Sequence, residues 1–145
     1  MPIKTFRGLM ADDTQDTVVL HTNNGATGYR IVKFQVIPKD IANKVAEHVV
    51  KIYKVPQTTV DGVIDFSSQT LLGAAFISND TSAHAYPPQD SVIFDQEIFN
   101  QDIYVTHKDM ATGEACNYYI ELEQVKLDLN ENTVATLKDI RNIAG

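Results

Sequence analysis

The chain has 145 residues, of which 43% are hydrophobic and 21% are charged, a balance typical of one folded domain over residues 1–145. The formal net charge of -7 at pH 7 disfavours binding to nucleic-acid phosphate, and the single cysteine, Cys116, excludes an intrachain disulfide. The first residues show no secretory signal pattern, and no apolar run approaches the about 18 residues of a membrane span. We therefore expect a soluble protein made in a cytoplasm, without nucleic-acid or membrane partners.

The first strong pattern predicts a β-hairpin. Residues 16–22 are rich in β-branched residues and residues 29–37 alternate in hydropathy, so both favour strands. The two faces of the second strand are Val32, Phe34 and Val36 on one side and Ile31, Lys33 and Gln35 on the other. The connection holds four residues that adopt positive φ at low cost, Asn23, Asn24, Gly25 and Gly28. Pro38 ends the second strand, which completes the predicted hairpin.

Residues 39–55 fit two patterns. Apolar residues recur at helical spacing behind Asp40, a candidate N-cap, whereas residues 47–55 form a β-branched and aromatic run. We expect a strand over 47–55, preceded at most by a helical turn. Further strands are predicted at 58–66, 70–78, 91–95, 101–109 and 114–129. Because turn signals recur at the spacing of all-β folds, we expect an all-β chain, an antiparallel β-sandwich or jelly roll of about seven to nine strands.

The last predicted strand changes phase along its length. One face carries Cys116, Tyr118, Ile120 and Leu122, and the other carries Val125, Leu127 and Leu129. Because successive side chains of a strand point to opposite faces, a bulge or bend near Glu123 is needed to keep both sets inside.

Both ends of the chain are candidate arms. Residues 132–145 place four apolar residues three apart behind Asn132, a candidate N-cap, which predicts a short helix or arm. The four residues are Val134, Leu137, Ile140 and Ile143. The segment is too short to be stable alone, so we predict that this stripe is an interaction site for the chain's own sheet or for a neighbouring subunit. Residues 1–10 are the second candidate arm.

No motif with catalytic spacing is present, so we expect no enzyme activity, no cofactor and no metal site. The four histidines, His21, His48, His84 and His107, lack the spacing of a zinc site. We interpret them as surface or hydrogen-bonded structural residues. Cys116 lies on the apolar face of its predicted strand, which indicates a buried, unreactive thiol.

Two acidic groups are weaker candidates. A calcium-binding turn could be formed by Asp12, Asp13 and Asp16, but the EF-hand spacing is absent and a solvated acidic turn is the favoured interpretation. A glycosidase carboxylate pair could come from Asp95, Glu97 and Asp102. We do not favour it, because any acidic β-protein contains such clusters.

Tyrosine side chains could supply a platform for stacking against sugars. The candidates are Tyr53, Tyr86, Tyr104, Tyr118 and Tyr119. Tyr118 is expected in the core and the chain has no Trp, so the sequence gives this binding mode no positive support.

Four segments, residues 21–38, 63–78, 98–109 and 117–143, resemble small virion structural proteins encoded by marine tailed bacteriophages. Within that group the chain is most similar to head decoration (cement) proteins, which are small, β-rich and present in many copies on a capsid. The resemblance implies a non-enzymatic capsid-stabilising protein in the virion. It further implies a homo-oligomer, taken as a trimer, with the major capsid protein or other virion proteins as partners. A tail or fibre protein and a glycan-binding adhesion module are the alternatives.

Overall fold

The computed structural model describes residues 2–22, 25–40, 46–78, 89–94 and 97–127. This part of the chain is all-β, as predicted, and forms eight strands with no helix. In chain order they are β1 (Ile3–Met10), β2 (Thr14–Val18), β3 (Thr27–Pro38), β4 (Glu47–Tyr53), β5 (Leu71–Ser78), β6 (Gln89–Ile93), β7 (Ile103–Asp109) and β8 (Cys116–Lys126). None of these residues belongs to a helix that could cross a membrane.

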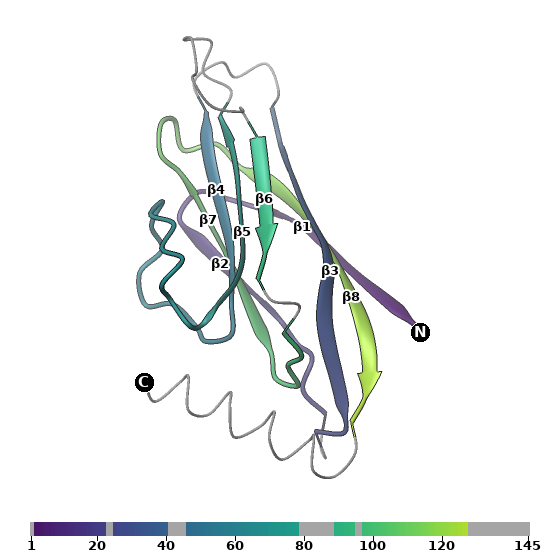
Figure 1. The fold of residues 1–145 in the computed structure, drawn as a ribbon. Helices are drawn as coiled ribbons and strands as arrows, with labels where there is room; N and C mark the ends of the chain where they lie inside the picture. The colour runs from purple at the N-terminus through teal and green to yellow at the C-terminus, as the bar shows by residue number, and fades with distance from the viewer. Residues whose placement is uncertain (1, 23–24, 41–45, 79–88, 95–96, 128–145) are drawn as a thin grey trace.

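The strands form two antiparallel sheets, seen as two layers in Figure 1. One sheet has the order β1-β8-β3 and the other has the order β2-β7-β4-β5-β6. The pairing is nested along the chain, because β1 pairs with β8, β2 with β7, and β4 with β5. The remaining two strands, β3 and β6, lie close to each other although each pairs within its own sheet.

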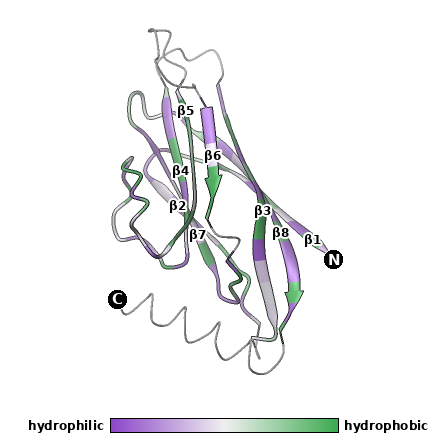
Figure 2. Cartoon of the chain, in the orientation of Figure 1, coloured by the Kyte–Doolittle hydropathy of each residue, from purple (hydrophilic) through white to green (hydrophobic). Residues whose placement is uncertain are grey.

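A shared hydrophobic core includes residues of both sheets. The larger sheet contributes buried residues such as Val50, Ile52 and Ile103, and the smaller sheet contributes Phe34 and Ile120. Hydrophobic and hydrophilic residues are mixed along the strands (Figure 2), as expected when one side of each strand faces a core. Burying one such side chain contributes about 1.5–3 kcal/mol, so packing between the sheets is the main stabilising contribution.

The five strands predicted at 47–55, 70–78, 91–95, 101–109 and 114–129 are confirmed as β4 to β8, with ends that differ by a few residues. On β8 the predicted inner face is buried, namely Cys116, Tyr118, Ile120 and Leu122. The predictions for β4 and β5 rested on runs of apolar, β-branched or aromatic residues, and nearly every residue of both strands is buried.

The predicted hairpin over residues 16–38 is wrong. The strand predicted at 16–22 is observed only as β2, which pairs with β7, whereas β3 pairs with β8 in the other sheet. The connection therefore passes from one sheet to the other. Gly25 has the predicted positive φ of 64°. Gly28 instead lies in β3, where an added Cβ would be only 2.9 Å from Ile98 Cγ2.

A bulge exists, but on the neighbouring strand. The β3–β8 register shifts between Ile31 and Lys33, so that Val32 is the extra residue and lies opposite the junction of Leu122 and Glu121. Val32 is 41% exposed while Ile31 is buried. The prediction that Val32 shares a face with Phe34 and Val36 is therefore wrong, since the bulge reverses the alternation at this point.

The strand predicted at 58–66 is also wrong, because these residues form an irregular loop between β4 and β5. Two aspartates bend this loop with their side chains. Asp61 accepts a hydrogen bond from the Val63 amide at 3.1 Å, and Asp65 accepts one from the Ser67 amide at 2.9 Å. Such local side-chain bonds compete with sheet pairing.

The two candidate arms have different outcomes. Ile3–Met10 form β1 and pair with β8 of the same chain, so most of the segment 1–10 is a sheet strand. The predicted C-terminal segment 132–145, with Val134, Leu137, Ile140 and Ile143, lies outside the described residues. Its docking remains a prediction.

Candidate functional site

The surface of the three-stranded sheet that faces away from the core is one candidate site. Asn117 of the central strand β8 pairs with Leu9 of β1 on one side and with Ile37 of β3 on the other. Two residues further along β8, Tyr119 pairs in the same way with Arg7 and Gln35. We call these six residues the outer face. Leu9 is 51% exposed and Ile37 is 60% exposed, which is unusual for large apolar side chains on paired strands. Open hollows lie on both sides of Tyr119.

The outer face continues to the edge strand β1. This strand pairs with β8 on one side, and no described strand pairs with its other side. Most of its residues are exposed, including Ile3 at 49%. An edge of this kind presents backbone N–H and C=O groups to which an extended segment of another protein can add. Lys4 and Arg7 on the same strand are charges that discourage unspecific pairing.

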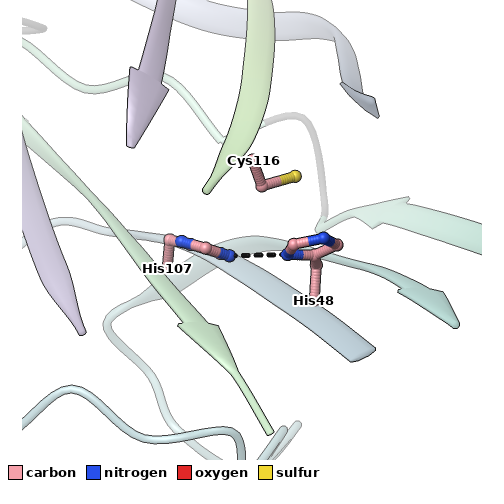
Figure 3. Close-up of side chains that lie close together, drawn as sticks. All are labelled: His48, His107 and Cys116. Carbon is pink, nitrogen blue, oxygen red and sulfur yellow. Dashed lines mark hydrogen bonds between the residues drawn. The ribbon is translucent and has the colours of Figure 1, made fainter. Parts of the chain in front are cut away.

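A second candidate site lies inside the protein. His48 on β4, His107 on β7 and Cys116 at the start of β8 come together between the two sheets (Figure 3). All three are at most 1% exposed. One donor atom from each residue lies within 4.8 Å of the other two. We call these three residues the histidine–cysteine cluster.

The register explains why the two histidines meet. His107 lies directly opposite Val50 on the neighbouring strand, and His48 is two residues before Val50. Residues two apart on a strand share a face, so both imidazoles point toward the core. Cys116 belongs to the inner face of β8 and reaches the same space from the opposite sheet.

Hydrogen bonds fix the protonation of the imidazole rings. His107 Nδ1 lies 3.0 Å from the carbonyl oxygen of Ala11, which can only accept, so Nδ1 carries the hydrogen. His107 Nε2 then presents a lone pair and accepts a hydrogen bond from His48 Nδ1 at 2.9 Å. The remaining nitrogen, His48 Nε2, is buried and has no hydrogen-bond partner within the described part of the chain. With the proton of neutral His48 on Nδ1, Nε2 carries an unused lone pair.

Asp109 supports the cluster from one side. Its Oδ1 accepts hydrogen bonds from the amides of Glu47 at 3.0 Å and Ala111 at 2.9 Å, and its Oδ2 accepts from the Glu114 amide and the Thr112 hydroxyl, both at 2.8 Å. Burial raises the pKa of Asp109, but these hydrogen bonds outweigh burial and hold the pKa well below its ordinary value. The carboxylate therefore fixes the turn between β7 and β8, which places Cys116.

The cluster combines two electrostatic influences. Burial, followed by the neighbouring His107, lowers the pKa of His48, whereas the carboxylates of Asp109, Glu114 and Asp12 act in the opposite direction. Burial, reinforced by Asp109, raises the pKa of the Cys116 thiol to about 12. The Cys116 thiol is thus protonated at pH 7, and burial disfavours the charged form of His48.

Of the three aspartates considered for calcium, Asp12 and Asp16 accept hydrogen bonds from different donors, while Asp12 and Asp13 both lie near Lys108 Nζ, at 3.9 Å and 4.0 Å. Asp12 Oδ1 accepts a hydrogen bond from the Asp109 amide at 2.7 Å, and Asp16 Oδ2 accepts one from the Tyr118 hydroxyl at 3.2 Å. Asp13 has a positive φ of 62° in the turn before β2, and its carboxylate lies 4.0 Å from Lys108 Nζ. These contacts direct the carboxylates to separate structural roles.

The carboxylates considered for glycoside hydrolysis also have separate partners. Glu97 accepts a hydrogen bond from Lys54. Asp102 Oδ1 accepts hydrogen bonds from the Leu20 amide at 2.8 Å and from His21, through its amide at 3.0 Å and Nδ1 at 2.7 Å. Asp102 thereby holds the connection that follows β2.

The remaining candidates are dispersed. Tyr53 and Tyr118 are buried, whereas Tyr104 and Tyr119 lie in different sheets, so these four do not form one stacking platform. Outside the described residues lie His84, Tyr86 and Asp95.

Sequence reasoning treated His48, His107 and Cys116 separately and missed that they meet. Cys116 is buried as predicted. The available signal was weak: each residue occupies an inward position of a predicted strand, where a polar side chain needs a partner. Their proximity depends on which strands pair, and no local spacing encodes that.

Comparison with known proteins gives no family assignment. No protein-family model matches the chain, and no curated protein matches it. The resemblance to phage virion proteins therefore has no support from these two comparisons.

Proposed function

We propose that this chain is a non-enzymatic structural protein of a tailed-bacteriophage virion, specifically a head decoration protein that binds the capsid as a homo-oligomer. The observation that carries the proposal is the outer face beside the open edge of β1. Exposed Leu9 and Ile37 on paired strands are the kind of surface that protein partners cover.

The fold supports the proposal. The nested pairs β1–β8, β2–β7 and β4–β5, with β3 close to β6, match a chain wound as one long antiparallel ribbon. An eight-stranded ribbon wound in this way gives a jelly roll, an architecture that viral capsid and lectin domains use. We infer a jelly-roll sandwich in which β6 has joined β5 and does not pair with β3.

The proposed contact uses two kinds of interaction. A partner strand adds to the open edge of β1 through backbone hydrogen bonds, and apolar partner residues cover Leu9 and Ile37. Each buried apolar side chain contributes on the order of 1.5–3 kcal/mol before the costs of association. The net charge of -7 keeps a protein soluble at the high local copy number that decoration requires.

The first test is mass spectrometry of purified virions, with copy number measured against the major capsid protein. A decoration protein is present in many copies in the head fraction. Detection in only a few copies, in the tail fraction, would favour the tail or fibre alternative, and absence from virions would refute both.

The second test addresses the outer face directly. Leu9→Asp and Ile37→Asp should abolish binding to capsids that lack the protein, while circular dichroism shows unchanged β structure. Val63→Asp is the matched control, because Val63 is 65% exposed but lies in the loop between β4 and β5. If all three variants bind like the original chain, the outer face is not the contact surface.

A further inference from the structure

We propose that His48, His107 and Cys116 form a binding site for a thiophilic transition-metal ion, Zn²⁺ or Cu⁺, that joins the two sheets. The inference is independent of the proposed virion role. It starts from the only group of three or more potential ligands (His, Cys, Asp or Glu) that lies close enough to hold an ion within the described ranges.

The donor set selects the class of ion. Two imidazole nitrogens and one sulfur are typical ligands of Zn²⁺ and Cu⁺, while Ca²⁺ and Mg²⁺ require oxygen ligands. The three residues come from β4, β7 and β8. A site built on paired strands of two sheets holds its ligands more rigidly than a site on loops.

The hydrogen bond between His107 and Ala11 is the second observation. Histidines that bind metals usually donate their other ring N–H to a carbonyl or carboxylate, which fixes the ring and leaves the second nitrogen free for the metal. His107 Nδ1–H donates to the Ala11 carbonyl in this way. Its Nε2 therefore presents a lone pair toward His48, beside Cys116 (Figure 3).

His48 adds an unpartnered donor atom. It is 1% exposed, and its buried Nε2 has no hydrogen-bond partner in the described part of the chain. A buried polar atom without a partner costs about 1–3 kcal/mol. Either nitrogen of His48 can bind the ion through a lone pair. The single ring proton is then on the other nitrogen.

The distances require only a small adjustment. With Zn–N near 2.0–2.1 Å and Zn–S near 2.3 Å, ligand atoms lie roughly 3.3–3.8 Å apart. The three donor atoms now lie within 4.8 Å of one another, and the two imidazoles are hydrogen-bonded at 2.9 Å. The largest of these separations must therefore shorten by about 1 Å at most, and the two hydrogen-bonded nitrogens must separate by about 0.4 Å if both bind the ion.

Charge around the site favours a cation. Asp12 accepts a hydrogen bond from the Asp109 amide at 2.7 Å, and the Asp109 carboxylate holds the turn that leads to Cys116, so two carboxylates lie beside the site. When the ion binds, the S–H bond of Cys116 breaks, a metal–sulfur bond forms and one proton leaves to solvent. No electron is transferred. The bound ion ties β4 and β7 to β8, an inter-sheet link in a chain whose single cysteine rules out an intrachain disulfide.

The first experiment loads the untagged full-length chain during refolding, because the site is buried. The chain is unfolded with reductant and chelator and refolded with Zn²⁺, Co²⁺, Cu⁺ or no metal. We expect one ion per chain to be retained after desalting, a melting temperature several degrees higher than that of the metal-free chain, and a sulfur-to-cobalt charge-transfer band. Retention of none of the three ions would overturn the proposal.

Variants assign the ligands. Substitution of a residue that only supports a metal ligand lowers metal affinity by about 10–100-fold. Cys116→Ser and His107→Gln should each weaken Zn²⁺ binding by more than this, because each removes a ligand. His21→Gln is the control, since the His21 side chain is 56% exposed, and it should bind like the original chain. If Cys116→Ser and His21→Gln bind Zn²⁺ equally well, the cluster is only a hydrogen-bonded histidine pair in the core.

X-ray absorption of the loaded original chain keeps the test decisive even if a variant fails to fold. A sulfur shell near 2.3 Å with nitrogen near 2.0–2.1 Å supports the site, whereas a shell of oxygen and nitrogen alone refutes it. Refolding with equal Zn²⁺ and Cu⁺ then identifies the preferred ion. Either ion in a sulfur-containing shell supports the proposal.

Discussion

Tyr118 of β8 and Asp16 of β2 connect the two sheets, because the Tyr118 hydroxyl donates a 3.2 Å hydrogen bond to the Asp16 carboxylate across the core. Burial, together with the negative charge of Asp16, raises the pKa of Tyr118 to about 12. The ring also occupies the space above Gly8, where an added Cβ would lie 2.9 Å from Tyr118 Cε1. The absence of a side chain at Gly8 therefore positions this tyrosine.

Tyr118→Phe should lower the free energy of unfolding by about 1–2 kcal/mol, since it leaves a partly buried carboxylate without its donor. Gly8→Ala should lower the free energy of unfolding by about 1–3 kcal/mol, because the added methyl group forces the Tyr118 ring to move. Urea denaturation measures both changes. Tyr119→Phe is the control, because its hydroxyl donates to Glu121 of the same strand and does not join the two sheets within the described residues. A loss as large as that of Tyr118→Phe would contradict the assigned inter-sheet role.

Asp109→Asn should lower the free energy of unfolding by about 2–4 kcal/mol at pH 7, because an amide cannot accept all of the hydrogen bonds made by the carboxylate. The pKa of Asp109 is lowered on folding from its ordinary 3.8. Its stabilising contribution is therefore fully present above the unfolded pKa and is lost as pH falls toward the folded pKa.

The difference between the original chain and Asp109→Asn should thus be constant from pH 5 to pH 8 and shrink below about pH 4. Urea denaturation at a series of pH values measures it. Asp65→Asn is the comparison in an exposed turn: hydrogen bonds from Ser67 also lower the pKa of Asp65, so its difference should be smaller but change with pH in the same direction. A difference that grows as the pH falls would show that the hydrogen bonds of Asp109 do not lower its pKa.

Lys51 and Asp61 should respond unequally to substitution. The Lys51 side chain is 3% exposed and its Nζ donates to Asp61 Oδ1 at 2.8 Å and to the Val63 carbonyl at 2.6 Å, while the Asp61 side chain is 55% exposed. Asp61→Asn leaves a buried ammonium without a counter-charge, whereas Lys51→Met leaves a carboxylate that water can solvate. We expect Asp61→Asn to lower the free energy of unfolding by about 1–2 kcal/mol more than Lys51→Met does, as measured by thermal or urea denaturation. The reverse order would refute this interpretation of the pair.

Calcium should leave the protein's stability nearly unchanged. Asp12 and Asp16 are already bound to the Asp109 amide and the Tyr118 hydroxyl, and a ligand stabilises only by binding the folded state more tightly. Differential scanning fluorimetry with added CaCl₂ measures the effect. A rise of many degrees, absent in Asp13→Asn, would establish the calcium site that we do not expect.

Deleting residues 132–145 tests the stripe predicted from Val134, Leu137, Ile140 and Ile143. If the segment docks on a neighbouring subunit, the truncated chain folds but loses its oligomeric state or capsid binding. If it docks on its own subunit, the chain is destabilised or insoluble. Light scattering and thermal unfolding separate the two, and full retention of stability, assembly and capsid binding would exclude the arm.

Sequence patterns predicted the strands better than their partners. Apolar, β-branched and aromatic runs bounded by turn signals located β4, β5, β7 and β8, because such runs indicate buried strands from the local sequence alone. The Asn-Asn-Gly connection indicated a reversal but not its destination, and β2 pairs with β7 far along the chain. At Val32 a single bulge residue reversed the predicted faces of β3. The strand predicted at 58–66 did not form, because aspartate side chains bend that segment.

The histidine–cysteine cluster was missed for the same reason. His48 and His107 are 59 residues apart and interact only because β4 pairs with β7. Cys116 joins them only because the smaller sheet packs against the larger one. Sequence identified Cys116 as buried and left the two histidines as surface or hydrogen-bonded residues, because their meeting depends on a strand pairing that no local pattern specifies.

The pairing of β1 with β8 also determines when the protein can fold. Ile3 lies opposite Glu123, so the smaller sheet cannot close until nearly all of the described chain has left the ribosome. Such sequence-distant contacts give a high contact order, which slows folding and prolongs the exposure of unpaired strands. We therefore expect β1 to remain unpaired during synthesis until β8 has emerged.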